Sequence, residues 1–253
     1  MPSIVITGAA SGIGRATAKL FYKNGWTVGL ADINEVELVA LQKTMDNKRS
    51  CILLMDVADE SSVEKAFATF KDFQGNSLDA LFNCAGILRM GDNDSISLKD
   101  QHQMISVNVN GILNCIYYAT PMLKLGHNAR IISMSSASAV YGTPQFAVYS
   151  ASKHAVRGLT EALNIEFEPQ SIYVCDLMVP FVDTPMVNEA THQASAVKNL
   201  GVNVTPLSVA KTVLRATKNK RVHWQVGVPM YLFSAINWAM PFNRRQLIKK
   251  YSE

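Results

Sequence analysis

The chain has 253 residues and a formal net charge of +4, with 48% of its residues hydrophobic and 17% charged. These values exclude a wholly disordered chain and supply enough apolar residues for a sizeable core, which one α/β domain of this length can hold. Nucleic-acid-binding proteins usually carry dense basic clusters with interleaved aromatic residues, and the first 200 residues show none, so we expect no nucleic-acid partner.

Cysteine and histidine usage indicates a reducing compartment. The five histidines and four cysteines are scattered, and no CxxC spacing occurs. We therefore predict no metal site and no disulfide framework. The sequence enters an apolar strand at once, without a basic n-region or cleavage site, and it holds no run of 18 uninterrupted apolar residues. We expect a cytoplasmic protein with neither a signal peptide nor a membrane-spanning helix.

Short apolar runs rich in β-branched residues alternate with helical patterns along the chain. The runs are continuous, as expected for strands of a parallel sheet that is covered on both faces. Strands are predicted at 3–7, 26–31, 50–55, 78–83, 129–134 and 173–178, with 222–227 as one further candidate. Helices are predicted at 13–23, 34–45, 60–73, 99–124 and 148–167. This alternation predicts a single α/β domain over residues 1–253, with a doubly wound, mostly parallel sheet and helices on both faces.

A glycine-rich loop, VITGAASGIGRA, joins the first predicted strand to the first helix with the spacing G-x-x-x-G-x-G. Glycine permits a sharp turn and a close approach of the backbone to a pyrophosphate, and the helix N-terminus adds free N–H groups and a positive dipole end. An ordinary turn is the alternative, but the position between strand and helix favours dinucleotide binding. The candidate cofactor contacts in this loop are Gly8, Ser11, Gly12, Ile13 and Gly14.

The second predicted strand ends in LADIN, which places Asp32 18 residues after Gly14. An acidic side chain there can accept hydrogen bonds from both ribose hydroxyls of adenosine and repels a 2′-phosphate, so it favours NAD over NADP. Arg15 follows the last glycine, and we expect its side chain to run along the helix surface. The alternative role for Asp32 is to cap the next helix, which Asn34 can do instead.

Two later turns offer further contacts to a cofactor. Asp56, in MDVAD after the third strand, can hold the adenine amino group, with the Val57 backbone beside it; the alternative is a carboxylate that caps a helix. In FNCAGI after the fourth strand, the small residues Ala85 and Gly86 allow a cofactor to lie across the strand ends. A plain turn is the alternative there.

Three motifs in series resemble those of the short-chain dehydrogenase/reductase family. They read Thr7-Gly8-x-x-x-Gly12-Ile13-Gly14, Asn83-x-Ala85-Gly86 and Tyr149-x-x-x-Lys153, and the resemblance covers about residues 3–220. Any long helix can carry the last pair, so the signal lies in the order of the three motifs. The resemblance implies a Rossmann-type fold, a nicotinamide cofactor, which Asn83 helps to hold, and a catalytic tetrad of Asn, Ser, Tyr and Lys.

The resemblance assigns the tetrad to Asn108, Ser136, Tyr149 and Lys153. The family's serine stands thirteen residues before the tyrosine, which selects Ser136 in SMSSASA, with Ser138 as the second choice. The family's Asn-x-x-Gly spacing in SVNVNG selects Asn108 over Asn110.

Tyr149 and Lys153 share a helix face because they stand four residues apart. Small residues at 150–152 keep the helix slim where a cofactor packs. A free tyrosine has a pKa near 10, and a nearby ammonium stabilises the phenolate, so we expect a lowered pKa and a Tyr149 that exchanges a proton with an alcohol or ketone. The resemblance implies that Lys153 also holds the nicotinamide ribose. It further implies that Ser136 hydrogen-bonds the substrate oxygen and that the Asn108 backbone holds a water of a proton relay. A surface Tyr and Lys with no such role are the alternative.

The chain departs from the family pattern after the sixth strand, where it reads VPFVDTPM. The nicotinamide end of the cofactor is assigned by the resemblance to Pro180, Val182 and Thr184. Phe181 stands where the family usually has glycine, and a ring there is expected to narrow the site or force the loop outward. Cys84 stands where a second Asn is common, a milder change that leaves Asn83 in place.

Residues 185–205 are the expected substrate lid. Tyr141, Met186 and His192 are candidates to face an apolar or mixed ligand, with simple packing as the alternative. The tail, 228–253, reads as a largely apolar helix broken by a proline and followed by basic residues. It resembles the tails of family members that act on lipophilic substrates. Contact with an anionic membrane surface is one interpretation, but we favour a helix that covers the site or a dimer partner.

Together these patterns predict an NAD-dependent oxidoreductase that acts on a secondary alcohol or ketone of apolar character, with NADP less favoured. By analogy, helices 99–124 and 148–167 form the contact of a homodimer, alone or within a homotetramer. Two alternatives remain: a non-catalytic dinucleotide-binding sensor or scaffold, which Phe181 favours, and an NADP-preferring carbonyl reductase.

Overall fold

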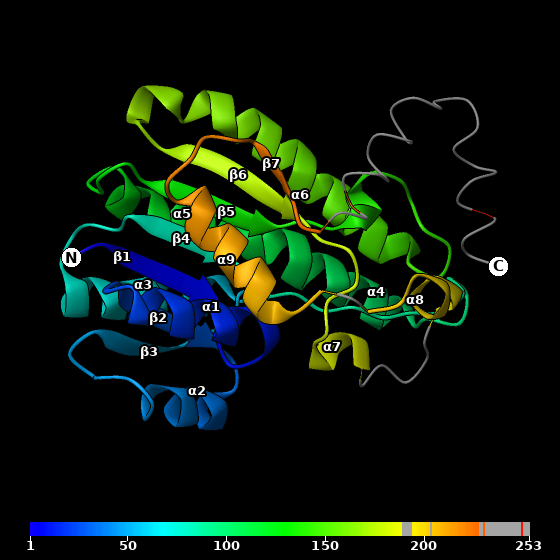
Figure 1. The fold of residues 1–253 in the computed structure, drawn as a ribbon, viewed down its shortest axis with the longest axis horizontal. Coiled ribbons are helices and arrows are strands. Elements are labelled where there is room, and N and C mark those ends of the chain that lie inside the picture. Colours follow the sequence, from blue (N-terminus) through cyan, green and yellow to red (C-terminus); the bar gives the residue numbers. More distant parts are fainter. Residues whose placement is uncertain (189–193, 203, 228–229, 231–248, 250–253) are drawn as a thin grey trace.

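The structure, a computed structural model, describes residues 1–188, 194–202, 204–227, 230 and 249. Within these residues, seven strands form one parallel sheet in the order β3-β2-β1-β4-β5-β6-β7 (Figure 1). The strands are β1 (Ser3–Thr7), β2 (Thr27–Asp32), β3 (Ser50–Leu54), β4 (Ala80–Asn83), β5 (Arg130–Met134), β6 (Tyr173–Met178) and β7 (His223–Gln225). The predicted α/β class with a doubly wound sheet is confirmed, and the candidate strand at 222–227 is β7.

Helices cover both faces of this sheet (Figure 1). One face packs against α1, α2 and α9, and the other against α3, α5 and α6. The helices are α1 (Gly12–Lys23), α2 (Glu35–Gln42), α3 (Glu60–Gln74), α4 (Leu98–Ile105), α5 (Gly111–Leu123), α6 (Ala147–Glu166), α7 (Pro185–Asn188), α8 (Ser195–Leu200) and α9 (Pro206–Ala216). Short turns of helix are η1 (Ser106–Asn110), η2 (Ala137–Ala139) and η3 (Glu168–Gln170).

The strands are apolar along their whole length because both faces are buried. In β1, Ile4 and Ile6 contact the core beneath α1, α2 and α9, whereas Val5 contacts the opposite core. Each such buried side chain contributes about 1.5–3 kcal/mol to stability. Since all strands run in parallel, their carboxyl ends meet at one edge, where the loops that follow them come together.

Two predicted helices differ from the observed ones. The helix predicted at 99–124 contains a π-helical turn, η1, between α4 and α5. Such turns occur frequently at functional sites. The helix predicted at 34–45 already ends at Gln42, where the Thr44 hydroxyl donates a hydrogen bond to the Leu41 carbonyl oxygen over 2.7 Å. Side chains of this type compete with the helical hydrogen bonds.

Helix α9 was not predicted, although its start is signalled in the sequence. The Thr205 hydroxyl accepts a hydrogen bond from the Ser208 amide at 3.3 Å, and Pro206 occupies the first turn. Both features are typical of helix N-termini. Val209 and Val213 then bury one face of α9 in the core shared with α1. The missed helix completes the cover over that face of the sheet.

Candidate active site

The glycine loop closes tightly between β1 and α1. Gly8 and Gly12 have φ angles of +69° and +47°, which favour glycine. A Cβ on Gly14 would lie only 2.0 Å from the Gly8 carbonyl oxygen, so no larger residue fits there. Ser11 is exposed and its side chain does not cap α1, whose first turn holds no acidic residue. Helix α1 therefore presents its first N–H groups to an anion, while Ile13 packs against the core.

Asp32 fastens the glycine loop to the end of β2. Its two carboxylate oxygens accept hydrogen bonds from the Ala10 and Asn34 amides, each at 3.0 Å. The cap of α2 is Asn34, whose side chain accepts from the Glu37 amide at 3.1 Å, so the capping alternative for Asp32 is wrong. Arg15 does not simply follow the helix surface: its guanidinium forms an ion pair with Glu37 of α2. The Glu37 carboxylate therefore neutralises the positive charge of Arg15 near the end of β2.

Asp56 follows β3 and is exposed. Its carboxylate accepts a hydrogen bond from the Ala58 amide at 2.9 Å, whereas the cap of α3 is Asp59. Val57 is buried where α5 begins, and a Cβ on Gly111 would lie 2.6 Å from its side chain. The Val57 carbonyl accepts a hydrogen bond from Asn114 at 3.0 Å. These contacts fix the turn after β3 against α5 and leave the Asp56 carboxylate accessible.

The turn after β4 lies against the glycine loop. The Thr7 hydroxyl accepts hydrogen bonds from the Cys84 and Ala85 amides, each at 3.0 Å, and a Cβ on Gly8 would lie 3.0 Å from the Ala85 backbone. Asn83 is buried and donates to the Ser133 hydroxyl at 3.2 Å, while its Oδ1 has no hydrogen-bond partner among the described residues. Thr7 stood in the sequence motif, but its role as the tie between the two loops required the structure.

Asn108 is fully buried in the π-helical turn η1. Its Oδ1 accepts from the Ile87 amide at 2.8 Å, and its Nδ2 donates to the Ile87 carbonyl at 2.9 Å and to the Ser152 hydroxyl at 3.2 Å. The rival Asn110 is exposed. A Cβ on Gly86 would lie 3.2 Å from Asn108 Oδ1. Asn108 thus joins the turn after β4 to helix α6, a contact that only a buried amide with both donor and acceptor can make.

Tyr149 and Lys153 occupy one face of α6 as expected, with the Lys153 Nζ 5.5 Å from the centre of the Tyr149 ring. The same Nζ donates a hydrogen bond to the Met134 carbonyl at 2.8 Å, a contact not visible in the sequence. Burial lowers the pKa of Lys153 to about 8.

The pKa of Tyr149 differs in direction from the expectation. Burial raises it to about 12, while a hydrogen bond with Ser136 acts in the opposite direction. Desolvation of the phenolate therefore outweighs any help from the Lys153 ammonium. Tyr149 is a neutral phenol at pH 7, the form that can donate a proton.

Four serines compete at the end of β5 and in the loop after it, and the structure separates them. Ser136 lies close enough to Tyr149 to lower the pKa of its phenol. Its hydroxyl also accepts from the Ser138 amide at 3.2 Å, which fixes the start of η2. Ser133 instead pairs with the turn after β4, and the Ser135 hydroxyl is buried without a partner among the described residues.

The segment after β6 lies over the glycine loop despite Phe181. Val182 forms a parallel bridge with Val204, and a Cβ on Gly12 would lie 3.1 Å from Thr184 Cγ2. The ring of Phe181 turns instead toward α6, where its centre is 5.9 Å from that of Phe146. The loop is therefore not forced outward, and the ring adds to the apolar wall beside the tyrosine.

An apolar cluster lies next to Tyr149 and ties together four segments of the chain. Its buried members are Leu88, Met90, Phe146, Val187, Ala194, Ala196 and Val197, with Tyr149, Phe181 and Val202 partly buried against them. The Phe146 ring centre lies 6.3 Å from that of Tyr149. Tyr141 and Met186 are not members, and Met186 is 40% exposed. His192 and nearly all of the predicted tail lie outside the described residues.

A model of the short chain dehydrogenase family matches residues 2–195 of the chain. The chain belongs to the short-chain dehydrogenase family. Membership makes it an oxidoreductase. The family resemblance inferred from the three motifs is thereby confirmed.

Relatives of this short-chain dehydrogenase act on different compounds. The 2,5-dichloro-2,5-cyclohexadiene-1,4-diol dehydrogenase of Sphingobium indicum is 35% identical over 191 residues, which cover 74% of this chain and 75% of that one. The 3-ketodihydrosphingosine reductase of Mus musculus is 28% identical over 248 residues, covering 94% of this chain and 74% of that one. Among solved structures, a short-chain dehydrogenase/reductase of Burkholderia phymatum in complex with NAD superimposes with a TM-score of 0.81 at 24% identity, covering 100% and 95% of the two chains.

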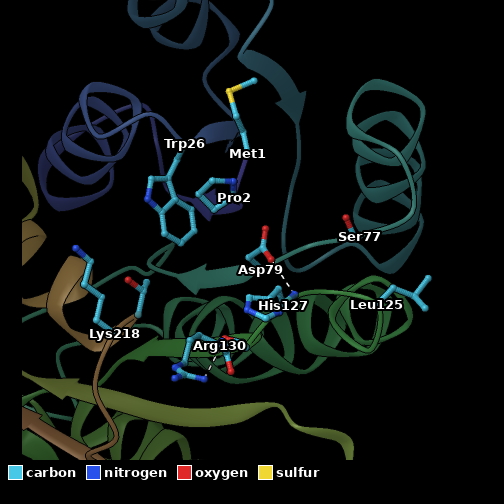
Figure 2. Close-up of a pocket in the computed structure, with 11 residues that line it drawn as sticks. Met1, Pro2, Trp26, Ser77, Asp79, Leu125, His127, Arg130 and Lys218 are labelled. Carbon is cyan, nitrogen blue, oxygen red and sulfur yellow. Dashed lines mark hydrogen bonds between the residues drawn. The ribbon is translucent and has the colours of Figure 1, made fainter.

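A separate cavity of about 510 Å³ lies at the opposite edge of the sheet, beside the amino ends of the strands (Figure 2). Two of its polar residues, Asp79 and Arg130, hold the backbone near the strand starts. The Asp79 carboxylate accepts from the Ser3 and His127 amides, and Arg130 donates to two backbone carbonyls. None of the predicted site residues lines it. Among the described residues, no cluster of His, Cys, Asp or Glu could hold a metal ion, and no helix is long and apolar enough to cross a bilayer.

Proposed function

We propose that this short-chain dehydrogenase transfers hydride between NAD(H) and a lipophilic secondary alcohol or ketone, with Asn108, Ser136, Tyr149 and Lys153 as its catalytic groups. The observation that carries the proposal is the convergence of Tyr149, Ser136 and Lys153 at the carboxyl edge of the sheet, beside the glycine loop. Ser136 lies close enough to Tyr149 to lower its pKa, and the buried Lys153 Nζ lies 5.5 Å from the centre of the Tyr149 ring.

The loops at this edge fit a dinucleotide. The loop before α1 has no side chain at Gly8, Gly12 and Gly14. A pyrophosphate could therefore come close to the loop backbone and to the first N–H groups of α1. The exposed Asp56 carboxylate and the Val57 backbone would hold the adenine end. Asn83, Ala85 and Gly86 would line the middle of the cofactor, and Pro180, Val182 and Thr184 its nicotinamide end. When bound, the nicotinamide accepts or supplies the hydride.

The protonation states of Tyr149 and Lys153 suit ketone reduction. Tyr149, with its pKa raised to about 12, holds the proton that a carbonyl oxygen needs as it becomes a hydroxyl. Ser136 would donate a second hydrogen bond to the same oxygen and stabilise its developing charge. Lys153 would stabilise the phenolate left behind and hold the ribose of the cofactor. Asn108 would fix the π-helical turn η1, so that its backbone can hold a water molecule of a proton relay. That relay would return a proton to Tyr149.

The adenosine end favours NAD over NADP. A carboxylate at Asp32 would repel a 2′-phosphate bound at the end of β2. Arg15 of α1 is paired with Glu37. An NADP-preferring carbonyl reductase is the alternative, and it would require Arg15 to leave that pair.

The apolar cluster supports a lipophilic substrate. Phe146 and Phe181 stand beside Tyr149, where the substrate must come close to the phenol. The mouse relative, which matches 94% of this chain, reduces 3-ketodihydrosphingosine by its name. We infer a ketone with an apolar body, covered by the lid at 185–205.

Helices α5 and α6 would form a homodimer contact. They expose Leu113, Tyr117 and Ile165, whose exposed fractions are 45%, 72% and 71%. If these side chains form one contiguous patch, that patch would mark the contact. We infer a homodimer or homotetramer in the cytoplasm. The tail at 228–253 would cover the active site or contact the partner subunit rather than bind a membrane surface.

Titration with NADH and with NADPH, followed by nicotinamide fluorescence and by melting temperature, tests this function first. We expect tighter binding of NADH and a higher melting temperature in its presence. Tighter NADPH binding would refute the Asp32 argument, and binding of neither would refute the cofactor assignment. NADH binding without turnover of any alcohol or ketone would favour a non-catalytic sensor, in which Phe181 obstructs the substrate position.

A further inference from the structure

A chain of charged side chains links the edge of the sheet to the helix that carries the catalytic pair. His223, on edge strand β7, lies between two carboxylates. Its Nδ1 is 2.9 Å from Asp176 Oδ1, and its Nε2 is 3.1 Å from Glu161 Oε1. Asp176, on β6, is completely buried, whereas Glu161, on α6, is half exposed. The imidazole therefore bridges the interior of the sheet and α6.

The α6 end of this bridge continues a row of residues that starts at the catalytic pair. Tyr149, Lys153, Arg157 and Glu161 follow one another at intervals of four residues. Each therefore lies next to the one before it, and the row turns gradually around α6. Arg157 Nε donates to Glu161 Oε1 at 2.9 Å, and its Nη1 donates to the Ala139 carbonyl at 3.4 Å. Ala139 ends η2, the turn that begins at Ser136. The network thus contacts both the helix of Tyr149 and the loop of Ser136.

The bridge requires a protonated imidazole. A carboxylate can only accept hydrogen bonds, so a histidine bonded to two of them must donate from both ring nitrogens. The hydrogen bond that His223 donates to Asp176 raises the pKa of His223, whereas burial lowers it. The charged groups that face the ring are Asp176 from β6 and Glu161 and Arg157 from α6. A neutral His223 keeps one N–H and loses one of the two contacts.

We propose that His223 is a positioning residue: in its protonated form it fastens α6 to β6 and so holds Tyr149 in register with Ser136. Loss of its proton releases one end of the bridge, and the alignment of the two hydroxyls loosens. The catalytic consequence rests on the proposed function, whereas the bridge itself does not.

Two conservative variants separate the bridge from the proton. In Asp176→Asn, the new amide can donate to Nδ1 of a neutral His223, which then donates from Nε2 to Glu161. In Glu161→Gln, the new amide can donate to Nε2 while Nδ1–H donates to Asp176. Both variants keep the bridge without the second proton. Because residue 161 is half exposed, Glu161→Gln is the variant to use if Asp176→Asn does not fold.

Hydrogen–deuterium exchange of α6 between pH 6 and 9, corrected for the intrinsic exchange rate, tests the bridge without any substrate. We expect protection of residues 147–166 in the natural protein to fall by about tenfold as His223 loses its proton, the effect of one charged hydrogen bond. Both variants should show no such fall. His102→Asn, which removes an exposed histidine of α4, should behave like the natural protein.

The catalytic consequence is measured on the same samples. The pH profile of kcat for NADH-dependent ketone reduction should have a falling limb that both variants lack, with the Kd for NADH unchanged. The decrease of kcat that follows from loss of the Lys153 proton should remain in the natural protein and in every variant. Equal loss of α6 protection in all proteins, or none in the natural protein, overturns the proposal. If no ketone is reduced, the proposed function fails, and the exchange result alone decides for or against the bridge.

Discussion

Asn108 offers a sharp test of how the turn after β4 is held against α6. Replacing it with alanine removes three hydrogen bonds, two with the Ile87 backbone and one with Ser152. Each such bond contributes about 1 kcal/mol, so Asn108→Ala should lower the free energy of unfolding by about 3 kcal/mol. In a domain of this size, that loss lowers the melting temperature by about 6–12 °C.

The assay is thermal and urea unfolding of the natural protein, Asn108→Ala and Asn110→Ala. Asn110 stands two residues away in the same π-helical turn but is exposed. Its replacement should change the free energy of unfolding by no more than about 0.5 kcal/mol. Equal effects of the two substitutions would refute the reasoning. A destabilised Asn108→Ala that retained full turnover would instead refute a role for Asn108 in catalysis.

Three further predictions concern the dinucleotide and the buried lysine. Asp32→Asn should weaken the preference for NADH over NADPH by about tenfold, equal to about 1.4 kcal/mol. Adding Glu37→Gln should weaken this preference further, because it frees Arg15 from its ion pair. Direct titrations that leave the preference unchanged would contradict both expectations. Gly14→Ala should abolish NADH binding, since its Cβ would lie 2.0 Å from a backbone oxygen, whereas Gly158→Ala, with open space around it, should bind normally in the same fluorescence titration. For Lys153, the pKa lowered to about 8 means that the unfolded chain binds more protons above pH 8. The unfolding free energy of the natural protein, minus that of Lys153→Met, should therefore rise between pH 8 and about 10.5, and a flat difference would argue against a buried cation.

The parts of the site that depend on local backbone chemistry were predictable from the sequence. The glycine spacing predicted a tight turn without side chains before α1. The structure shows that a side chain at Gly14 would clash with the Gly8 carbonyl oxygen. The choice of Asn108 over Asn110 agrees with their burial. For Gly14 the deciding contact is local, with the Gly8 carbonyl oxygen. Asn108 is held by the distant residues Ile87 and Ser152, so its motif indicated the position but not the contacts.

Contacts between segments that lie far apart in the sequence could not be predicted from its patterns. The ion pair of Arg15 with Glu37 joins two helices, and the bridge from Asp176 to His223 joins residues 47 positions apart. The raised pKa of Tyr149 depends on how much water the assembled site excludes, which no spacing reveals. Phe181 was expected to disturb its loop, but Phe146 offers its ring a place in the apolar cluster.

Turnover and cofactor binding of Tyr149→Phe, measured on the same sample, test the central claim most directly. NADH oxidation would be followed against a series of ketones with apolar bodies, and the Kd for NADH by nicotinamide fluorescence. If Tyr149 supplies the proton, the substitution should lower kcat by about 10²–10⁴-fold and leave the Kd for NADH within about twofold. Turnover by Tyr149→Phe at the rate of the natural protein would contradict the account.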